Sequence, residues 1–138
     1  MTVNTKPIGV AYEDQSIIGA DRILTDRELG YTSAAQGTVT QATSKSTAVT
    51  LNKSAGVITM NNASLATATN ATFTLNNNLI SANDTVILTI SGGQATAGSY
   101  NVFANSLAAG SVSITLRNIS GASLSEAIVI NFALIHCA

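Results

Sequence analysis

The chain has little of the chemistry that most enzymes and metal sites need. Its 138 residues include no tryptophan, one proline, one histidine and one cysteine. The single Cys137 cannot form an intramolecular disulfide, so nothing in the sequence favours a disulfide-rich secreted scaffold, and synthesis in a reducing intracellular compartment is the simpler interpretation. Because one histidine, one cysteine and Asp84 supply no ligand cluster, and Asp21, Asp26 and Glu28 lack the spacing of a calcium loop, we expect no metal and no cofactor.

Charge is also scarce. Charged residues make up 9% of the chain and the formal net charge is −1. The six basic residues are scattered, so no positive stripe could neutralise a run of phosphates, and nucleic-acid binding is not expected. The N-terminus lacks the apolar core of a signal peptide, and no run of eighteen apolar residues occurs, so neither export nor a membrane span is predicted. The low charge, together with a mean hydropathy of +0.32, is typical of a protein that buries much of its surface in contacts within an assembly.

The sequence also lacks a glycine-rich phosphate-binding loop. Ser91-Gly92-Gly93 is followed by a strand pattern instead of a helix, and we interpret it as a hairpin turn. With six aromatic residues the chain offers few platforms on which a sugar could stack. Sugar binding through amides and hydroxyls stays open.

The charge that is present lies mostly at the start. Eight of the thirteen charged residues precede residue 32. This shift predicts an N-terminal arm of residues 1–36 followed by a domain of residues 37–138. The capping-box spacing of Thr25 and Glu28, with Gly30 behind it, predicts one helical turn. The apolar groups of the arm are too few for a core of their own and are candidate assembly contacts: Ile8, Tyr12, Ile17, Ile18, Ile23, Leu24, Leu29 and Tyr31.

The remainder of the chain has a β pattern throughout. Short runs rich in valine, isoleucine, threonine and phenylalanine recur at roughly ten-residue spacing, separated by turn residues. They predict eight strands, at 38–42, 47–52, 57–61, 71–75, 85–91, 100–105, 111–118 and 127–135. In several of them apolar residues alternate with threonine, serine or asparagine, as expected of half-buried strands. The pattern predicts an all-β fold, an eight-stranded antiparallel sandwich of jelly-roll-like type, with a smaller sandwich plus an added hairpin as the alternative.

The last stretch, residues 127–135, differs from the others because both of its faces are apolar. Ile128, Ile130, Phe132 and Leu134 share one face, while Val129, Asn131, Ala133 and Ile135 share the other. Its β-branched content argues against a helix. We expect a second sheet to cover one face and another element or a neighbouring subunit to cover the other, which makes Val129 and Ile135 candidate assembly contacts. A central strand buried within one domain explains the pattern equally well.

His136 and Cys137 are adjacent and invite a nucleophile-and-base interpretation. In an extended chain, however, neighbouring side chains point to opposite faces, so the imidazole does not readily approach the sulfur. We therefore predict no catalytic residues and no enzymatic activity.

Several segments carry a resemblance to a known class of proteins. They are Gly37-Thr38-Val39-Thr40-Gln41-Ala42-Thr43-Ser44-Lys45-Ser46-Thr47-Ala48-Val49-Thr50-Leu51-Asn52-Lys53, then Gly56-Val57-Ile58-Thr59-Met60-Asn61, Arg117-Asn118-Ile119-Ser120, and Ser125-Glu126-Ala127-Ile128-Val129-Ile130-Asn131-Phe132. Over about residues 37–135 the chain resembles a β domain common in virion proteins of tailed bacteriophages. The arm, with Gly19-Ala20-Asp21-Arg22 and Leu29-Gly30-Tyr31, is similar to the segments that anchor such proteins on a capsid or baseplate.

The resemblance implies a structural role in a virion, with no catalytic motif to carry over. The expected function is that of a capsid decoration or cement protein, assembled in the host cytoplasm and located on the capsid surface. Its expected partners are further copies of itself, taken as a homotrimer, and the major capsid protein or another virion protein. The alternative is a tail-fibre or receptor-binding domain that recognises host surface glycans.

Overall fold

The computed structural model describes residues 21, 22 and 24–137, and the chain divides into two compact units, Met1–Gly30 and Tyr31–Ala138. The described part of the first unit bends at Asp26 and Arg27 but contains no helix, so the helical turn predicted there is wrong. A helical turn, η1 (Ser33–Ala35), occurs instead in the second unit. A capping pattern alone does not offset the cost of nucleating a helix where no apolar face is packed. In the described residues, no helix has the length and apolar character needed to cross a membrane.

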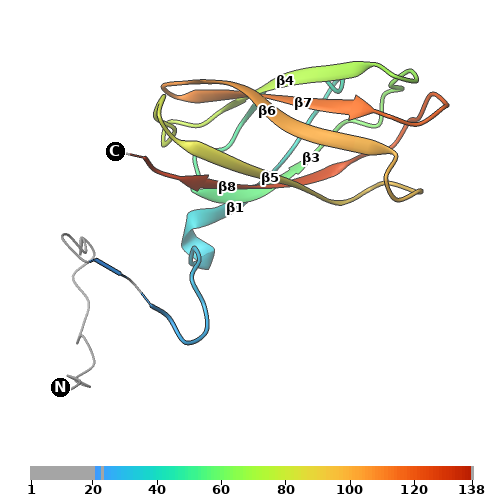
Figure 1. Cartoon of the computed structure of the whole chain (residues 1–138). Coiled ribbons are helices and arrows are strands. Elements are labelled where there is room, and N and C mark those ends of the chain that lie inside the picture. The colour runs from blue at the N-terminus through green and yellow to red at the C-terminus, as the bar shows by residue number, and fades with distance from the viewer. Residues whose placement is uncertain (1–20, 23, 138) are drawn as a thin grey trace. The chain divides into compact units, whose positions relative to one another are not determined.

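The second unit is a sandwich of two four-stranded sheets (Figure 1). Its strands are β1 (Gln36–Thr40), β2 (Val49–Thr50), β3 (Ala55–Thr59), β4 (Asn70–Asn76), β5 (Thr85–Gly92), β6 (Tyr100–Ala108), β7 (Ser111–Asn118) and β8 (Val129–Ile135). Sheet A has the order β1-β3-β8-β5 and sheet B the order β2-β4-β7-β6. The predicted all-β, eight-stranded, jelly-roll-like sandwich is confirmed, with every strand within a few residues of its expected position.

The connections differ from those of a simple antiparallel sandwich. From β1 to β6 the chain changes sheet at every connection, so strands next but one in the sequence share a sheet. As a result β1 and β3 are parallel, as are β2 and β4, while the other pairs are antiparallel as expected. The hairpin predicted at Ser91-Gly92-Gly93 is wrong, because β5 and β6 lie in different sheets. Within the described chain, the hairpin between sequential strands is β6–β7.

The core lies between the sheets and follows from the alternation of the strands. Phe73 and Leu75 of β4 and Ile114 of β7 are buried on the inner face of sheet B, and Ile58 of β3 and the inward residues of β8 are buried on that of sheet A. Each large apolar side chain buried in this way contributes about 1.5–3 kcal/mol. Pooling two half-apolar sheets therefore stabilises a domain that contains no disulfide.

Strand β8 has two unlike faces. Ile130, Phe132 and Leu134 point into the core and are buried, so the expectation of a second sheet over this face is confirmed. On the other face Val129 and Ala133 are half-buried and Ile135 is exposed. Cover of that second face by a neighbouring subunit stays a prediction.

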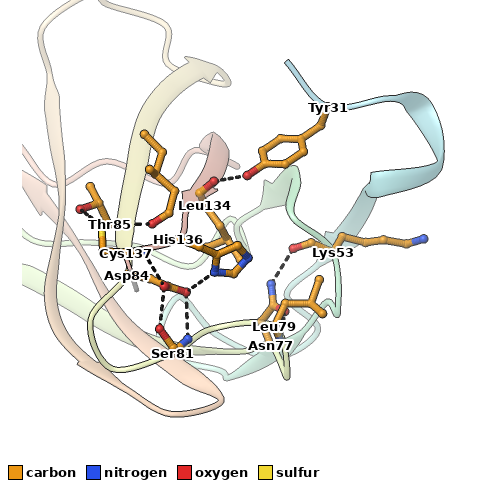
Figure 2. Close-up of polar contacts among 11 residues, drawn as sticks. Tyr31, Lys53, Asn77, Leu79, Ser81, Asp84, Thr85, Leu134, His136 and Cys137 are labelled. Atoms are coloured by element: carbon orange, nitrogen blue, oxygen red, sulfur yellow. Dashed lines mark hydrogen bonds and ion pairs between the residues drawn. The ribbon is translucent and has the colours of Figure 1, made fainter. Parts of the chain in front are cut away.

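Residues 31–36 are tied to the sandwich by polar contacts. The Tyr31 hydroxyl donates a hydrogen bond to the carbonyl oxygen of Leu134 (Figure 2). The side-chain amide of Gln36 donates to the carbonyl oxygen of Tyr31 at 3.0 Å, and Lys53 Nζ donates to that of Ala34 at 2.9 Å. The compact unit thus begins at Tyr31, a few residues before the boundary placed at residues 36 and 37 from the charge pattern.

Candidate assembly face

The outer face of sheet A is formed by the residues that alternate with the buried ones along its four strands. They are Gln36, Thr38 and Thr40 of β1, Ala55, Val57 and Thr59 of β3, Thr85, Ile87, Thr89 and Ser91 of β5, and Val129, Asn131, Ala133 and Ile135 of β8. None of them is charged. A whole sheet face without charge presents no electrostatic obstacle to contact with a second uncharged surface.

Part of this face is apolar and open to solvent. Ile87 is 46% exposed and Ile135 is 49% exposed. The strand register places Ile87 opposite Ala133 and Thr85 opposite Ile135, so the two isoleucines lie diagonally across β5 and β8. We name Ile87, Ala133 and Ile135 the β5–β8 patch.

The β5–β8 patch reaches the edge of the sheet. Strand β5 ends the strand order of sheet A, and its residues Thr85–Gly92 include no proline and no charged side chain. Charge, proline and marked irregularity are the usual protection of an edge against pairing with another chain. The register shift between Ile90 and Gly92 interrupts this edge at one end only.

The outer face of sheet B has a different character. The Thr72 hydroxyl pairs with that of Thr115 at 2.7 Å, Thr115 donates to Asn105 Oδ1 at 3.0 Å, and Arg117 donates to Asn70 Oδ1 at 3.2 Å. Phe103, at 39% exposed, is an apolar exception. Because its hydroxyls and amides satisfy one another and also attract water, this face suits solvent better than the outer face of sheet A does.

The predicted assembly contacts are distributed unevenly. Ile8, Tyr12, Ile17, Ile18 and Ile23 lie outside the described residues. Leu24 and Leu29 belong to the first unit, where both side chains are exposed. In the second unit, Val129 and Ile135 share the outer face of sheet A, and Tyr31 is bonded to the backbone of β8.

A polar cluster at the end of β8 brings Asp84 and His136 together, 52 residues apart in sequence (Figure 2). His136 Nδ1 lies 2.8 Å from Asp84 Oδ2, and the carboxylate also accepts the Ser81 hydroxyl at 2.6 Å, the Ser81 backbone N–H at 2.9 Å and the Cys137 backbone N–H at 3.3 Å. The Asp84 side chain is 1% exposed, whereas that of His136 is 56% exposed. The carboxylate therefore joins the turn before β5 to the chain leaving β8.

The hydrogen bonds of this cluster hold the turn before β5 and the chain after β8 together. The hydrogen bonds from the Ser81 hydroxyl and the Ser81 backbone lower the pKa of Asp84 to about 2, Cys137 and His136 act in the same direction, and burial opposes them. Serine, histidine and aspartate are present, but the serine donates to the carboxylate and not to the imidazole, so this arrangement does not activate the Ser81 hydroxyl. Cys137 Sγ lies 3.9 Å from Thr85 Oγ1. Among the described residues, no group of three or more histidine, cysteine, aspartate or glutamate side chains could hold a metal.

Sequence reasoning treated Asp84 as isolated and missed its pairing with His136. The local signal was the Ser81–Asp84 spacing, which is typical of a side-chain-bonded turn. That signal could place the carboxylate in a turn, but the histidine arrives only through the pairing of β5 with β8.

A second buried polar group surrounds Lys45. Its Nζ donates to the carbonyl oxygens of Asn61 at 2.6 Å and Glu126 at 2.5 Å. Burial lowers the pKa of Lys45, and the Glu126 carboxylate opposes that shift. Burial, together with the same carboxylate, raises the pKa of Tyr100. The two Lys45 contacts join its loop to Asn61 and Glu126, which lie far from each other in the sequence.

Comparison with known proteins identifies no relative of this chain. No protein-family model matches the chain, and no curated protein or solved structure is significantly similar to it. The resemblance to phage virion proteins therefore stays a prediction from sequence, and function is argued from the surfaces described above.

Proposed function

We propose that the protein is a structural subunit of a tailed-bacteriophage virion, a capsid decoration or cement protein that binds the shell as a homo-oligomer. The observation that carries the proposal is the uncharged outer face of sheet A, with the half-exposed β5–β8 patch on an unprotected edge. Its place would be the capsid surface, its partners further copies of itself, taken as three, and the major capsid protein. No enzymatic step is assigned to it.

The apolar patch supports self-association on physical grounds. Exposed isoleucines lose contact with water when a second copy covers them, which is worth about 25 cal/mol for each Å² buried. Two uncharged faces meet without the cost of desolvating ions. An unpaired edge strand adds backbone donors and acceptors that a neighbouring strand can satisfy.

Sedimentation velocity at micromolar concentration tests the self-association. We expect an oligomer for the unmodified chain and dissociation in the Ile87→Lys variant, because a lysine in the β5–β8 patch places charge in the contact. Phe103→Lys is the matched control, since it changes an exposed aromatic residue on the outer face of sheet B. A monomeric unmodified chain, or equal effects of the two variants, would contradict the proposed interface.

Attachment to the shell is assigned to the arm. We expect a chain lacking residues 1–30 to lose co-sedimentation with capsids of the phage that encodes it, while keeping the oligomeric state of the full chain. The cut at residue 30 spares Tyr31 and its bond to β8. Binding that survives the deletion would remove the arm from the proposal.

The second candidate is a receptor-binding domain for host surface glycans. The amide and hydroxyl groups on the outer face of sheet B favour it, because such groups match the hydroxyls of sugars. Saturable binding of the isolated protein to host cells, with no binding to capsids, would select this function over the first.

A further inference from the structure

A pocket opens on the outer face of sheet A, over β1, β3 and the adjoining part of β8, next to the β5–β8 patch. Its volume is about 400 Å³, within the range of roughly 300–1,000 Å³ typical of small-molecule sites. Residues of β1, β3 and β8 line it, together with Tyr31.

The floor and walls of the pocket follow from the strand register. Gly37 of β1 lies beside Gly56 of β3, and Gly56 lies opposite Phe132 of β8, so the backbone of three adjacent strands forms the floor. Thr38, Val57 and Asn131 form one row of outward side chains across the same strands. The Tyr31 ring borders the pocket and is held by the bond from its hydroxyl to Leu134.

Three polar side chains in the lining each have a hydrogen-bond donor or acceptor that no other described residue uses. Gln36 uses its amide nitrogen on the Tyr31 carbonyl, which leaves its amide oxygen as an acceptor. Asn131 uses Oδ1 to accept the Ser91 hydroxyl at 2.8 Å, which leaves its amide nitrogen as a donor. The Thr38 hydroxyl has no partner among the described residues and can serve as either. Acceptor, donor and hydroxyl thus lie around one cavity next to an aromatic ring.

The chemistry of the lining selects a class of ligand. Among the described residues, no charged side chain lines the pocket, so these residues have no charge to pair with a phosphate, a carboxylate or a cation. Each hydroxyl of a neutral sugar both donates and accepts, and the C–H face of its ring packs on aromatic side chains. We propose that this pocket binds one ring of a neutral carbohydrate, with Thr38, Asn131 and Gln36 contacting its hydroxyls and Tyr31 packing against the ring.

The sugar site does not depend on the assembly function. The pocket is lined by β1, β3 and by Asn131 and Phe132 of β8, whereas the two isoleucines of the β5–β8 patch lie on β5 and at the end of β8. The two regions adjoin at Ala133, which pairs with Ala55 of the pocket lining. A protein that fails to oligomerise can still bind sugar, and a protein that assembles can fail to bind it, so the two experiments separate.

The test is a nuclear magnetic resonance titration of the isotope-labelled full chain with D-glucose, D-galactose, D-mannose and L-rhamnose, each as free sugar and as methyl glycoside. We expect saturable shifts of the Gly37 and Gly56 backbone amides and of the Asn131 side-chain amide with at least one sugar. Response to the methyl glycoside identifies the end of a glycan chain as the source, and response to the free sugar alone identifies a monosaccharide. Glycerol serves as a polyol control and should produce no saturable shift.

Two variants test the assigned contacts. Thr38→Val and Asn131→Ala should each weaken binding by about fivefold to tenfold, the effect of losing one neutral hydrogen bond. Thr89→Val is the matched control, because Thr89 lies on the same outer face of sheet A but outside the pocket, and it should leave the affinity unchanged. The amide spectrum of each variant reports whether its fold is retained.

Several results would overturn the proposal. They are the absence of any shift at these amides up to about 100 mM sugar, far above the millimolar range of weak single-ring binding; shifts that map to the Phe103 face; an equal response to glycerol; or full affinity in folded Thr38→Val and Asn131→Ala proteins.

Discussion

Asp84 and Lys45 are ionisable side chains that the fold removes almost completely from water, and each is compensated in its own way. Asp84 accepts hydrogen bonds from Ser81, His136 and Cys137. Lys45 instead donates to two backbone carbonyl oxygens that come from distant parts of the chain. A buried charge without such partners would destabilise the fold, so both residues are expected to be sensitive to substitution.

Because the fold favours the charged form of Asp84, we expect the protein to lose stability in acid. Its folded pKa of about 2 lies below the ordinary value of 3.8, so its contribution is fully present above that value and is lost as the pH falls towards 2. Asp84→Asn should lower the melting temperature at neutral pH and flatten its decline between about pH 5 and pH 2. Thermal melts across this range measure the effect. Asp26→Asn, in the first unit, is the control; parallel profiles of Asp84→Asn and the unmodified chain would contradict the assignment.

We expect the contacts of the Lys45 ammonium to contribute more to the free energy of unfolding than the exposed contact of Lys53. Lys45→Met should lower the free energy of unfolding by about 2–4 kcal/mol, because two partly buried carbonyl groups lose a charged donor. Lys53→Met removes one exposed contact to Ala34 and should cost about 0.5 kcal/mol or less. Urea denaturation provides both values, and similar costs for the two variants would refute this reasoning.

At the level of elements, the connection from β5 to β6 decides the topology. Gly93, directly after β5, has φ +86°, and a β-carbon there would lie 2.1 Å from the carbonyl oxygen of Ala127. The chain can cross from sheet A to sheet B here only because this position has no side chain. Farther along the same connection, Gly98 has φ +79° but open space around it.

These two glycines form a matched pair. Gly98→Ala should cost about 1–2 kcal/mol for the left-handed backbone alone. Gly93→Ala should cost about 2–5 kcal/mol, because the collision with the Ala127 backbone is added to the same backbone cost. Denaturant unfolding of both variants tests the difference, and equal losses would show that the close approach at Gly93 is relaxed without cost.

At the level of the whole molecule, the two outer faces differ in chemistry. The outer face of sheet A has no charge and exposes isoleucine, while that of sheet B carries mutually bonded hydroxyls and amides, the Arg117 side chain and the exposed Phe103 ring. Such a difference between faces is expected of a protein that turns one face to partners and the other to water. The proposed self-association and the proposed sugar pocket both lie on the outer face of sheet A.

The unit that carries these faces should fold without the arm. We expect a chain of residues 31–138 to have nearly the melting temperature of the full chain, because the sandwich forms its own compact unit. A chain of residues 37–138 should be less stable by about 1–3 kcal/mol, since it loses the bonds of Tyr31 and Ala34 to the sandwich. Circular dichroism melts compare the two. Equal stability of both fragments would favour the boundary at residues 36 and 37.

Particular residues show which features of the structure could be predicted from the sequence. Alternation around Phe73 and Ile114 identified strands and their buried faces correctly, because a period of two depends only on the local chain. Gly92-Gly93 was correctly interpreted as a change of direction but wrongly as a hairpin, since a tight turn does not specify which sheet the next strand joins. Of the candidate contacts, the sequence indicated Val129 and Ile135 from the apolar second face of the last strand, whereas Ile87 was not singled out.

The sequence by itself determined the all-β class, the number of strands and the residues that face the core, because these follow from local preference and from the burial of alternating apolar side chains. Only the tertiary structure decided which strands pair, that β1 lies parallel to β3, that His136 reaches Asp84, and that Thr38 and Asn131 border one pocket. Those contacts join residues far apart in the chain, and their geometry depends on the packing of the two sheets against each other, which no local pattern encodes.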